Sequence, residues 1–131
     1  MPVSPYLHFA GNCAEALAFY ETALGATIDL RLTHAESPMP SPPGWGDKIM
    51  HTTFSILGSS LMGSDLPPDM YNKAVGFRVA LNMDAPDTAK TWFEALAEGG
   101  TIEMPLQKTF WASAFGMVTD RFGIPWMVNC S

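Results

Sequence analysis

The sequence predicts an α+β fold built from two repeated modules, each with the element order β-α-β-β-β. The first observation is a pair of segments with helical spacing of apolar residues, each followed by glycine. The second is a motif found at 57–62 and again at 122–127: an apolar residue, glycine, two variable positions, a large apolar residue and methionine. The third is a set of β-forming stretches before and after each helix. Together these observations predict a duplicated chain.

The two halves align with one another around a single insertion. Phe19 matches Phe93 and Gly25 matches Gly99, both at a shift of 74 residues, whereas the glycine motifs align at a shift of 65. The difference of nine residues is roughly the length of a proline-rich stretch, 34–46, that occurs only in the first half. We therefore predict one domain over residues 1–131, made of two modules at about 1–67 and 74–131.

The first module begins with a strand predicted over residues 2–10. Asn12 is placed to cap the helix that follows, with Glu15 as its capping-box partner. Apolar residues at 13, 16, 17, 20 and 24 follow helical spacing, and Gly25 is placed to end the helix in the left-handed conformation. Residues 26–33 predict the second strand.

The stretch from His34 to Gly46 contains four prolines and two glycines, so it predicts neither a helix nor a central strand. A long loop of this kind in a compact domain is commonly either disordered or functional. Two interpretations therefore stay open, a disordered excursion and a lid that carries Trp45. A contact between two copies of the chain is a further role open to this loop.

A β-hairpin is predicted from the strands 48–57 and 60–66 around the turn Gly58-Ser59, which suits a type II′ turn. In that register, residues whose numbers sum to 117 face each other. One face of the hairpin is apolar and suits packing on a helix. The other face is semi-polar and suits a solvated cleft; it carries His51, Thr53, Ser55, Ser60, Met62 and Ser64.

The second module follows a connector at 67–73 and begins with a strand predicted over 75–83. Asp84 is placed as a helix N-cap, and Pro86 fits the first helical turn. Gly99 and Gly100 end the helix. Further strands are predicted over 101–107, 113–120 and 124–129, with Asp120 as a residue of the last turn.

Composition excludes several classes of function. The formal net charge is −6, which makes a nucleic acid an unfavourable partner. No run of 18 apolar residues occurs, so no membrane span is predicted. The N-terminus lacks the basic start and apolar run of a signal peptide, and the two cysteines, Cys13 and Cys130, form no C-x-x-C pair. These features favour a cytoplasmic location.

The chain resembles the vicinal oxygen chelate (VOC) superfamily, the glyoxalase and bleomycin-resistance fold of paired βαβββ modules. Within it, the PhnB-like branch, also labelled demethylubiquinone methyltransferase-like, is the most similar. The resemblance implies two modules that form a half-open barrel with a cleft, and chains that pair as homodimers. The stretches that carry it are SPYLHFAGNC at 4–13, Phe19-Tyr20 with Leu24-Gly25, LMGSD at 61–65, TFW at 109–111 and TDRFGIPW at 119–126.

Metal-dependent members of the superfamily place two histidines on first strands and two glutamates on last strands. Counted from the helix and turn motifs, these positions fall on Pro5, Phe77, Met62 and Met127. None of these side chains is a plausible ligand for a hard or borderline divalent ion. The resemblance therefore implies the fold without the metal site, and we expect no metal and no cofactor.

Two histidines and one carboxylate are the main polar candidates. His8 lies three residues from Pro5, so strand alternation predicts that it points to the opposite face, under the helix. His51 lies on the semi-polar hairpin face, where it is either a structural histidine or a general base or substrate anchor. Asp65 points away from His51 by alternation, so the two are not expected to share a metal.

The leading hypothesis is a metal-independent protein that binds a small, partly apolar molecule. The alternative is an enzyme, an isomerase, lyase or dioxygenase, that uses a displaced metal or His51 as acid and base. Methyl transfer is not expected, because the chain has no G-x-G-x-x-G turn for a nucleotide donor. The predicted cleft carries aromatic, methionine and polar side chains: His51, Ser55, Met62, Phe77, Trp111, Met127 and Asn129.

Overall fold

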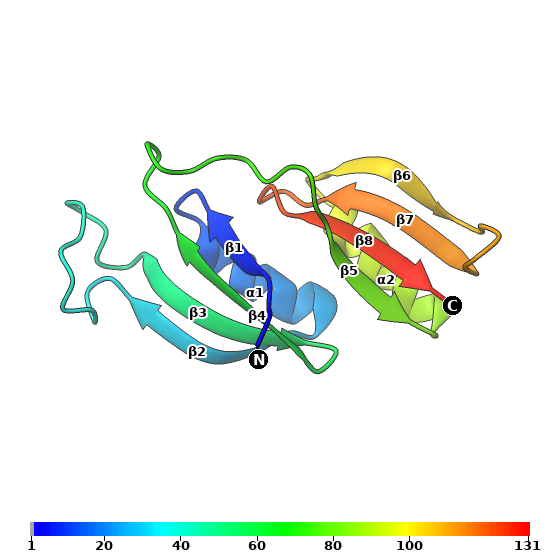
Figure 1. The fold of residues 1–131 in the computed structure, drawn as a ribbon, viewed down its shortest axis with the longest axis horizontal. Coiled ribbons are helices and arrows are strands. Elements are labelled where there is room, and N and C mark those ends of the chain that lie inside the picture. Colours follow the sequence, from blue (N-terminus) through cyan, green and yellow to red (C-terminus); the bar gives the residue numbers. More distant parts are fainter. Residues whose placement is uncertain (1) are drawn as a thin grey trace. The chain divides into compact units, whose positions relative to one another are not determined.

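The computed structural model describes residues 2–131, which divide into two compact units, unit 1 (up to residue 72) and unit 2 (73–131). Each unit contains one four-stranded sheet and one helix (Figure 1). The element order β-α-β-β-β is the same in both units, so the predicted α+β class and its repeat are confirmed. The two sheets are separately hydrogen-bonded and do not form one closed barrel. The predicted cleft between them stays a prediction.

Unit 1 has the strand order β1-β4-β3-β2, in which only the β1–β4 pair is parallel. Helix α1 covers one face of this sheet. Tyr20 of the helix is fully buried and its ring stacks 6.0 Å from that of Phe54, while Leu7 and Phe9 complete the core beneath it. The elements are β1 (Tyr6–Phe9), α1 (Cys13–Leu24), β2 (Thr27–Thr33), β3 (Ile49–Ile56) and β4 (Ser59–Asp65).

Unit 2 repeats this arrangement with the strand order β5-β8-β7-β6, and again only the first pair is parallel. Helix α2 contributes Ala89, Phe93 and Leu96 to the core, and the sheet contributes the buried Trp126 and Val128. The elements are β5 (Val79–Met83), α2 (Pro86–Ala97), β6 (Thr101–Gln107), β7 (Ala114–Thr119) and β8 (Pro125–Cys130).

The predicted N-cap position is confirmed for α1 and wrong for α2. Asn12 occupies the N-cap position of α1 but makes no side-chain cap bond, and the N-cap of α2 is Ala85 rather than Asp84. In α1 the acceptor comes from the sheet: the Asp65 carboxylate accepts the N–H of Cys13 at 2.8 Å. The predicted C-terminus of α1 is confirmed, because Gly25 has φ 63° in the left-handed region.

The predicted hairpin between β3 and β4 exists, but its register is wrong by two residues. Phe54 faces Leu61 and Ser55 faces Ser60, so paired residue numbers sum to 115 rather than 117. The turn is Leu57-Gly58, with φ 52° and 77°, and two positive values define a type I′ rather than a type II′ turn. A shift of two leaves every side chain on its predicted face.

The strand predicted over 75–83 is shorter, since β5 begins only at Val79. Gly76 has φ 86°, which interrupts the extended conformation before the strand starts. Residues 75–78 thus form a separate segment, which lines a hollow in unit 2. Among residues 2–131, no helix has the length and hydrophobicity needed to cross a membrane.

Both cysteines are buried, and burial raises the pKa of the Cys13 thiol from 9.0 to about 12, with Asp65 adding to the shift. The thiol of Cys13 ionises at a lower pH in the unfolded protein than in the folded one. Its contribution to the free energy of unfolding is therefore complete below pH 9 and is lost as the pH rises toward 12.

We expect iodoacetamide to leave both thiols unmodified in the folded protein at pH 8 and to modify both in denaturant. Rapid alkylation of native protein, followed by mass spectrometry, would contradict this expectation.

Candidate functional site

The open face of the unit 1 sheet, which the helix leaves uncovered, carries a cluster of one tyrosine and two histidines. The Tyr6 hydroxyl lies 3.1 Å from Nδ1 of His51, within hydrogen-bond distance. The Tyr6 ring lies 5.3 Å from that of His8 and 5.7 Å from that of His51. His8 and Tyr6 are exposed and His51 is half-buried, so the cluster can be reached from solvent.

The position of His8 corrects the sequence-based prediction. Leu7 and Phe9 are buried under α1, so alternation places Tyr6 and His8 on the open face, together with His51. The prediction took the face of His8 from that of Pro5, and the position of Pro5 was found by counting back from the helix. That count crosses the turn at residues 10–12, where strand alternation does not apply. The alternating buried residues Leu7 and Phe9 are the signal that identifies Tyr6 and His8.

Met62 and Ser55, both predicted site residues, share this open face with His51. Met62 of β4 lies between Tyr6 and Thr53 in the register of the sheet. Ser55 donates a hydrogen bond to Asp29 at 2.5 Å. Asp65, by contrast, is buried on the helix side, where it accepts from Cys13 and from the N–H of Ile49 at 2.9 Å, so the prediction that it points away from His51 is confirmed.

The open face of the unit 2 sheet contains a hollow of about 640 Å³, a volume typical of small-molecule sites. Its floor is formed by Met117 and Met127, which face each other on β7 and β8. Val75 and Phe77, 78% and 50% exposed, belong to the rim. The complete lining is Lys73, Ala74, Val75, Gly76, Phe77, Arg78, Glu103, Met117, Thr119, Pro125 and Met127.

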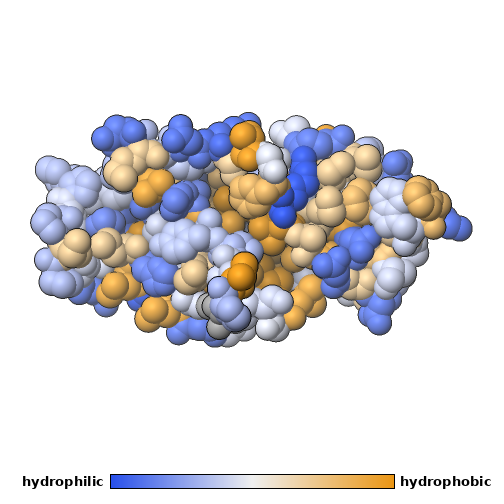
Figure 2. Space-filling view, in the orientation of Figure 1, coloured by the Kyte–Doolittle hydropathy of each residue, from blue (hydrophilic) through white to orange (hydrophobic). Residues whose placement is uncertain are grey.

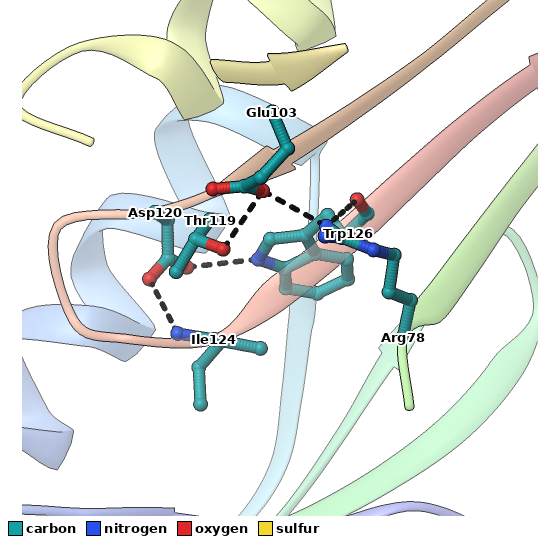
Figure 3. A network of polar contacts seen from close by, with 6 residues as sticks. All are labelled: Arg78, Glu103, Thr119, Asp120, Ile124 and Trp126. Atoms are coloured by element: carbon teal, nitrogen blue, oxygen red, sulfur yellow. Dashed lines mark hydrogen bonds and ion pairs between the residues drawn. The ribbon is translucent and has the colours of Figure 1, made fainter. Parts of the chain in front are cut away.

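A polar network fixes one wall of the hollow (Figure 3). Nη1 of Arg78 donates to the Glu103 carboxylate at 3.0 Å and to the Trp126 carbonyl at 3.2 Å. The same oxygen of Glu103 accepts from the Thr119 hydroxyl at 3.0 Å. On the other side of the strand, the Trp126 indole donates to the buried Asp120 at 2.8 Å. The guanidinium is therefore held in one place before any ligand arrives.

The carboxylate and hydroxyl of this wall repeat those of unit 1. Asp29 and Glu103 are 74 residues apart, and each lies at an irregularity in the second strand of its unit. Each accepts a hydrogen bond from a hydroxyl on the neighbouring strand, Ser55 in unit 1 and Thr119 in unit 2. Only Glu103 also forms an ion pair within residues 2–131, so the two open faces differ in charge.

The predicted site residues thus fall into two groups. His51, Ser55 and Met62 share the open face of unit 1, while Phe77 and Met127 line the hollow of unit 2. The other two lie outside this lining. Asn129 donates to Asn82 at 3.2 Å, and Trp111 is 54% exposed and packs 5.3 Å from the ring of Phe115.

Nine of the eleven lining residues were not predicted as site residues, among them Met117 of the floor and the polar pair Arg78 and Glu103. Their contact joins the residue before β5 to the irregular position of β6, and spacing along the chain does not bring these positions together. The repeat contains a partial signal, since Glu103 is the counterpart of Asp29. A second hollow, of about 440 Å³, lies between α2 and the strands β6 and β7, and it includes Lys90 and Phe93.

The positions equivalent to the superfamily's metal ligands do not fit a metal ion. Pro5 and Phe77 have no side-chain donor, and Met62 and Met127 offer only thioether sulfur. Among residues 2–131, no group of three His, Cys, Asp or Glu side chains could hold a metal. These positions therefore offer no site for a hard or borderline divalent ion.

The loop 34–46 is closed at its neck by two backbone bonds, from the N–H of His34 to Lys48 and from that of Ala35 to Gly46. Inside the loop the rings of His34 and Trp45 meet edge to face at 5.6 Å. The His34 Nδ1 atom also lies 2.8 Å from the Ser41 hydroxyl. The loop thus folds on its own side chains, as compact surface loops do.

The fold and these sites define a member of the Glyoxalase/Bleomycin resistance protein/Dioxygenase superfamily, and the chain belongs to it: the family model matches residues 4–128. It is 42% identical to Protein YjdN of Escherichia coli (strain K12) over an aligned length of 139 residues, which covers 98% of this chain and 95% of the relative. The crystal structure of PA1353 from Pseudomonas aeruginosa is 47% identical, with a TM-score of 0.90 over 98% of this chain and 96% of that one.

A putative 3-demethylubiquinone-9 3-methyltransferase, the PhnB protein of Bacillus cereus, shares the fold with a TM-score of 0.86. It is 23% identical, and all of both chains is covered. The resemblance to the VOC superfamily, with a PhnB protein among its structural neighbours, is therefore confirmed.

Proposed function

We propose that this protein binds a small, partly apolar molecule on its open sheet faces, without a metal ion. The observation that carries the proposal is the hollow of unit 2, where Met117 and Met127 form the floor beside Phe77. Methionine side chains are flexible and polarizable, and they suit surfaces that adapt to a ligand. The other predicted residues are proposed as binding residues of their own units: His51, Ser55 and Met62 on the open face of unit 1, and Trp111 and Asn129 in unit 2.

The absence of a metal is part of the proposal. It is supported by the donor set at the superfamily's ligand positions, which offers two thioethers and no imidazole or carboxylate. Elemental analysis of untagged protein tests it. A first-row metal near one equivalent per chain, whose removal also abolishes ligand binding, would replace this proposal with that of a metal enzyme.

The neutral fluorophore N-phenylnaphthylamine is a suitable first probe, because it is apolar and becomes fluorescent when it leaves water. We expect saturable binding to the folded protein, and we expect Met127→Gln to weaken it by roughly fivefold, since a half-buried methionine contributes about 1 kcal/mol of apolar burial. Met39→Gln, an exposed methionine of the loop, is the matched control and should leave the affinity unchanged. Equal effects of the two substitutions, or no saturable binding, would exclude the hollow as the site.

A second candidate function is metal-free acid–base catalysis on the open face of unit 1. The contact of 3.1 Å between the Tyr6 hydroxyl and His51 favours it, because a hydroxyl that fixes one ring nitrogen leaves the other oriented for proton transfer. Exchange of the protons next to the carbonyl of small keto acids into D₂O, followed by NMR, is the test. If wild type and His51→Gln exchange them at the same rate, this candidate is wrong.

We also infer that the protein acts as a homodimer in the cytoplasm. Exposed hydrophobic side chains, shown in orange among hydrophilic ones in Figure 2, and the strand edges of each sheet support self-association. Two buried cysteines without a disulfide suit a reducing compartment. Light scattering that gives the mass of one chain at tens of micromolar would contradict the dimer.

A further inference from the structure

The lining of the hollow on the open face of unit 2 carries a net positive charge. It contains the cations Lys73 and Arg78 and the single anion Glu103, a net charge of +1, in a chain whose net charge is −6. The two cations of this lining can therefore attract an anion, although the chain as a whole is acidic. We propose that the ligand of the hollow is an organic anion: an apolar body that lies on the two methionines, with one carboxylate or similar group at Arg78. This inference rests on the proposed function and specifies its ligand.

The geometry of Arg78 supports this assignment. Its bonds to Glu103 and Trp126 both start from Nη1, so Nη2 and Nε have no partner among residues 2–131. These two nitrogens are the pair that a planar oxyanion accepts from in a two-bond contact. Glu103 is itself held by Thr119, so the guanidinium loses little conformational freedom when an anion binds.

Lys73 supplies a second, adaptable charge. It is exposed, it belongs to the hollow, and it makes no ion pair with another residue of 2–131. Its ammonium group is a mobile point charge, so it attracts an anion without fixing its orientation. The apolar floor of Met117 and Met127 lies in the same hollow, so one molecule can satisfy both kinds of contact.

A matched pair of probes separates the charge from the apolar body. Anilinonaphthalene sulfonate has the same two aromatic parts as N-phenylnaphthylamine but carries one anionic group. We expect the anionic probe to bind wild type more tightly, and its affinity to fall with added salt while that of the neutral probe stays nearly constant. Arg78→Gln should weaken the anionic probe by about tenfold and the neutral probe by less than about twofold, because only the anion loses a charge-assisted contact.

Two more variants control for folding and for other binding places. Lys73→Gln changes an exposed side chain, so it should leave the fold intact and weaken the anionic probe by about threefold. Lys90→Gln removes the same charge from the second hollow, on the helix side of the same unit, and should have no effect.

The outcomes distinguish this inference from the proposed function. If both probes bind equally well and Arg78→Gln and Lys73→Gln change neither, the ligand is not an anion, while the binding site of the proposed function stands. If neither probe binds, the proposed function itself fails. If Lys90→Gln weakens the anionic probe as much as Arg78→Gln does, the anion binds elsewhere and the inference is wrong.

Discussion

Replacing Asp120 with alanine should lower the free energy of unfolding by about 3–5 kcal/mol, the largest loss that we expect from any carboxylate of the two units. Asp120 is 3% exposed and accepts three hydrogen bonds: from the N–H of Phe122 at 2.9 Å, from that of Ile124 at 3.0 Å and from the Trp126 indole at 2.8 Å. Alanine leaves all three donors without this acceptor. Buried donors that lose their partner cost more than the bond itself contributed.

Urea denaturation measures this loss, and Asp84→Ala is the matched control. Asp84 is an exposed aspartate of the same unit and does not cap α2, so its replacement should change the free energy of unfolding by less than about 0.5 kcal/mol. A loss below about 1 kcal/mol for Asp120→Ala would show that the turn before β8 does not depend on this carboxylate. Asp120→Ala should also weaken binding at the hollow. Asp120 holds the Trp126 indole, and the Trp126 carbonyl in turn accepts a hydrogen bond from Arg78 (Figure 3).

Among the carboxylates, Asp65→Ala should be the second most damaging change, with a loss of about 3 kcal/mol. One carboxylate, 5% exposed, accepts the first N–H of α1 and the N–H of Ile49 at the start of β3. It thus joins three elements of unit 1 and places a negative charge at the positive end of the helix. Both donors would remain buried without it.

Asn12→Ala tests whether the side chain at the N-cap position of α1 contributes to stability, as the Asp65 carboxylate is expected to do. An N-cap asparagine ordinarily contributes about 1 kcal/mol, but the Oδ1 atom of Asn12 is buried and has no hydrogen-bond partner within residues 2–131. We therefore expect its removal to be neutral within about 0.5 kcal/mol. If thermal unfolding shows Asn12→Ala to be more harmful than Asp65→Ala, the cap predicted from the sequence is the true one.

Local patterns predicted the elements well, because helices and strands are specified by short-range chemistry. The spacing of apolar residues and Gly25 placed α1 at its observed bounds, and the repeat predicted the element order that both units share. The capping hydrogen bond predicted for Asn12 is absent for the opposite reason. The acceptor of the first helix comes from Asp65, fifty-two residues from Cys13, and no local pattern reports such a contact.

The sheet face on which a side chain lies could be predicted only where the alternation of side chains was counted within a single strand. His51, Ser55 and Met62 were placed on the open face although the register was off by two, because such a shift preserves the face. His8 was misplaced when the count crossed a turn. The Arg78–Glu103 pair could not be predicted, since it depends on an irregular position in β6 and on where β5 begins.

The measurement that tests the central claim most directly is NMR of the protein labelled at its methionine methyl groups. Met117 and Met127 line the hollow, whereas Met39 and Met70 are each 59% exposed elsewhere. Titration with N-phenylnaphthylamine should shift the signals of Met117 and Met127 in a saturable way and leave those of Met39 and Met70 in place. Saturable shifts of Met39 or Met70, with those of Met117 and Met127 unchanged, would contradict a binding site in this hollow.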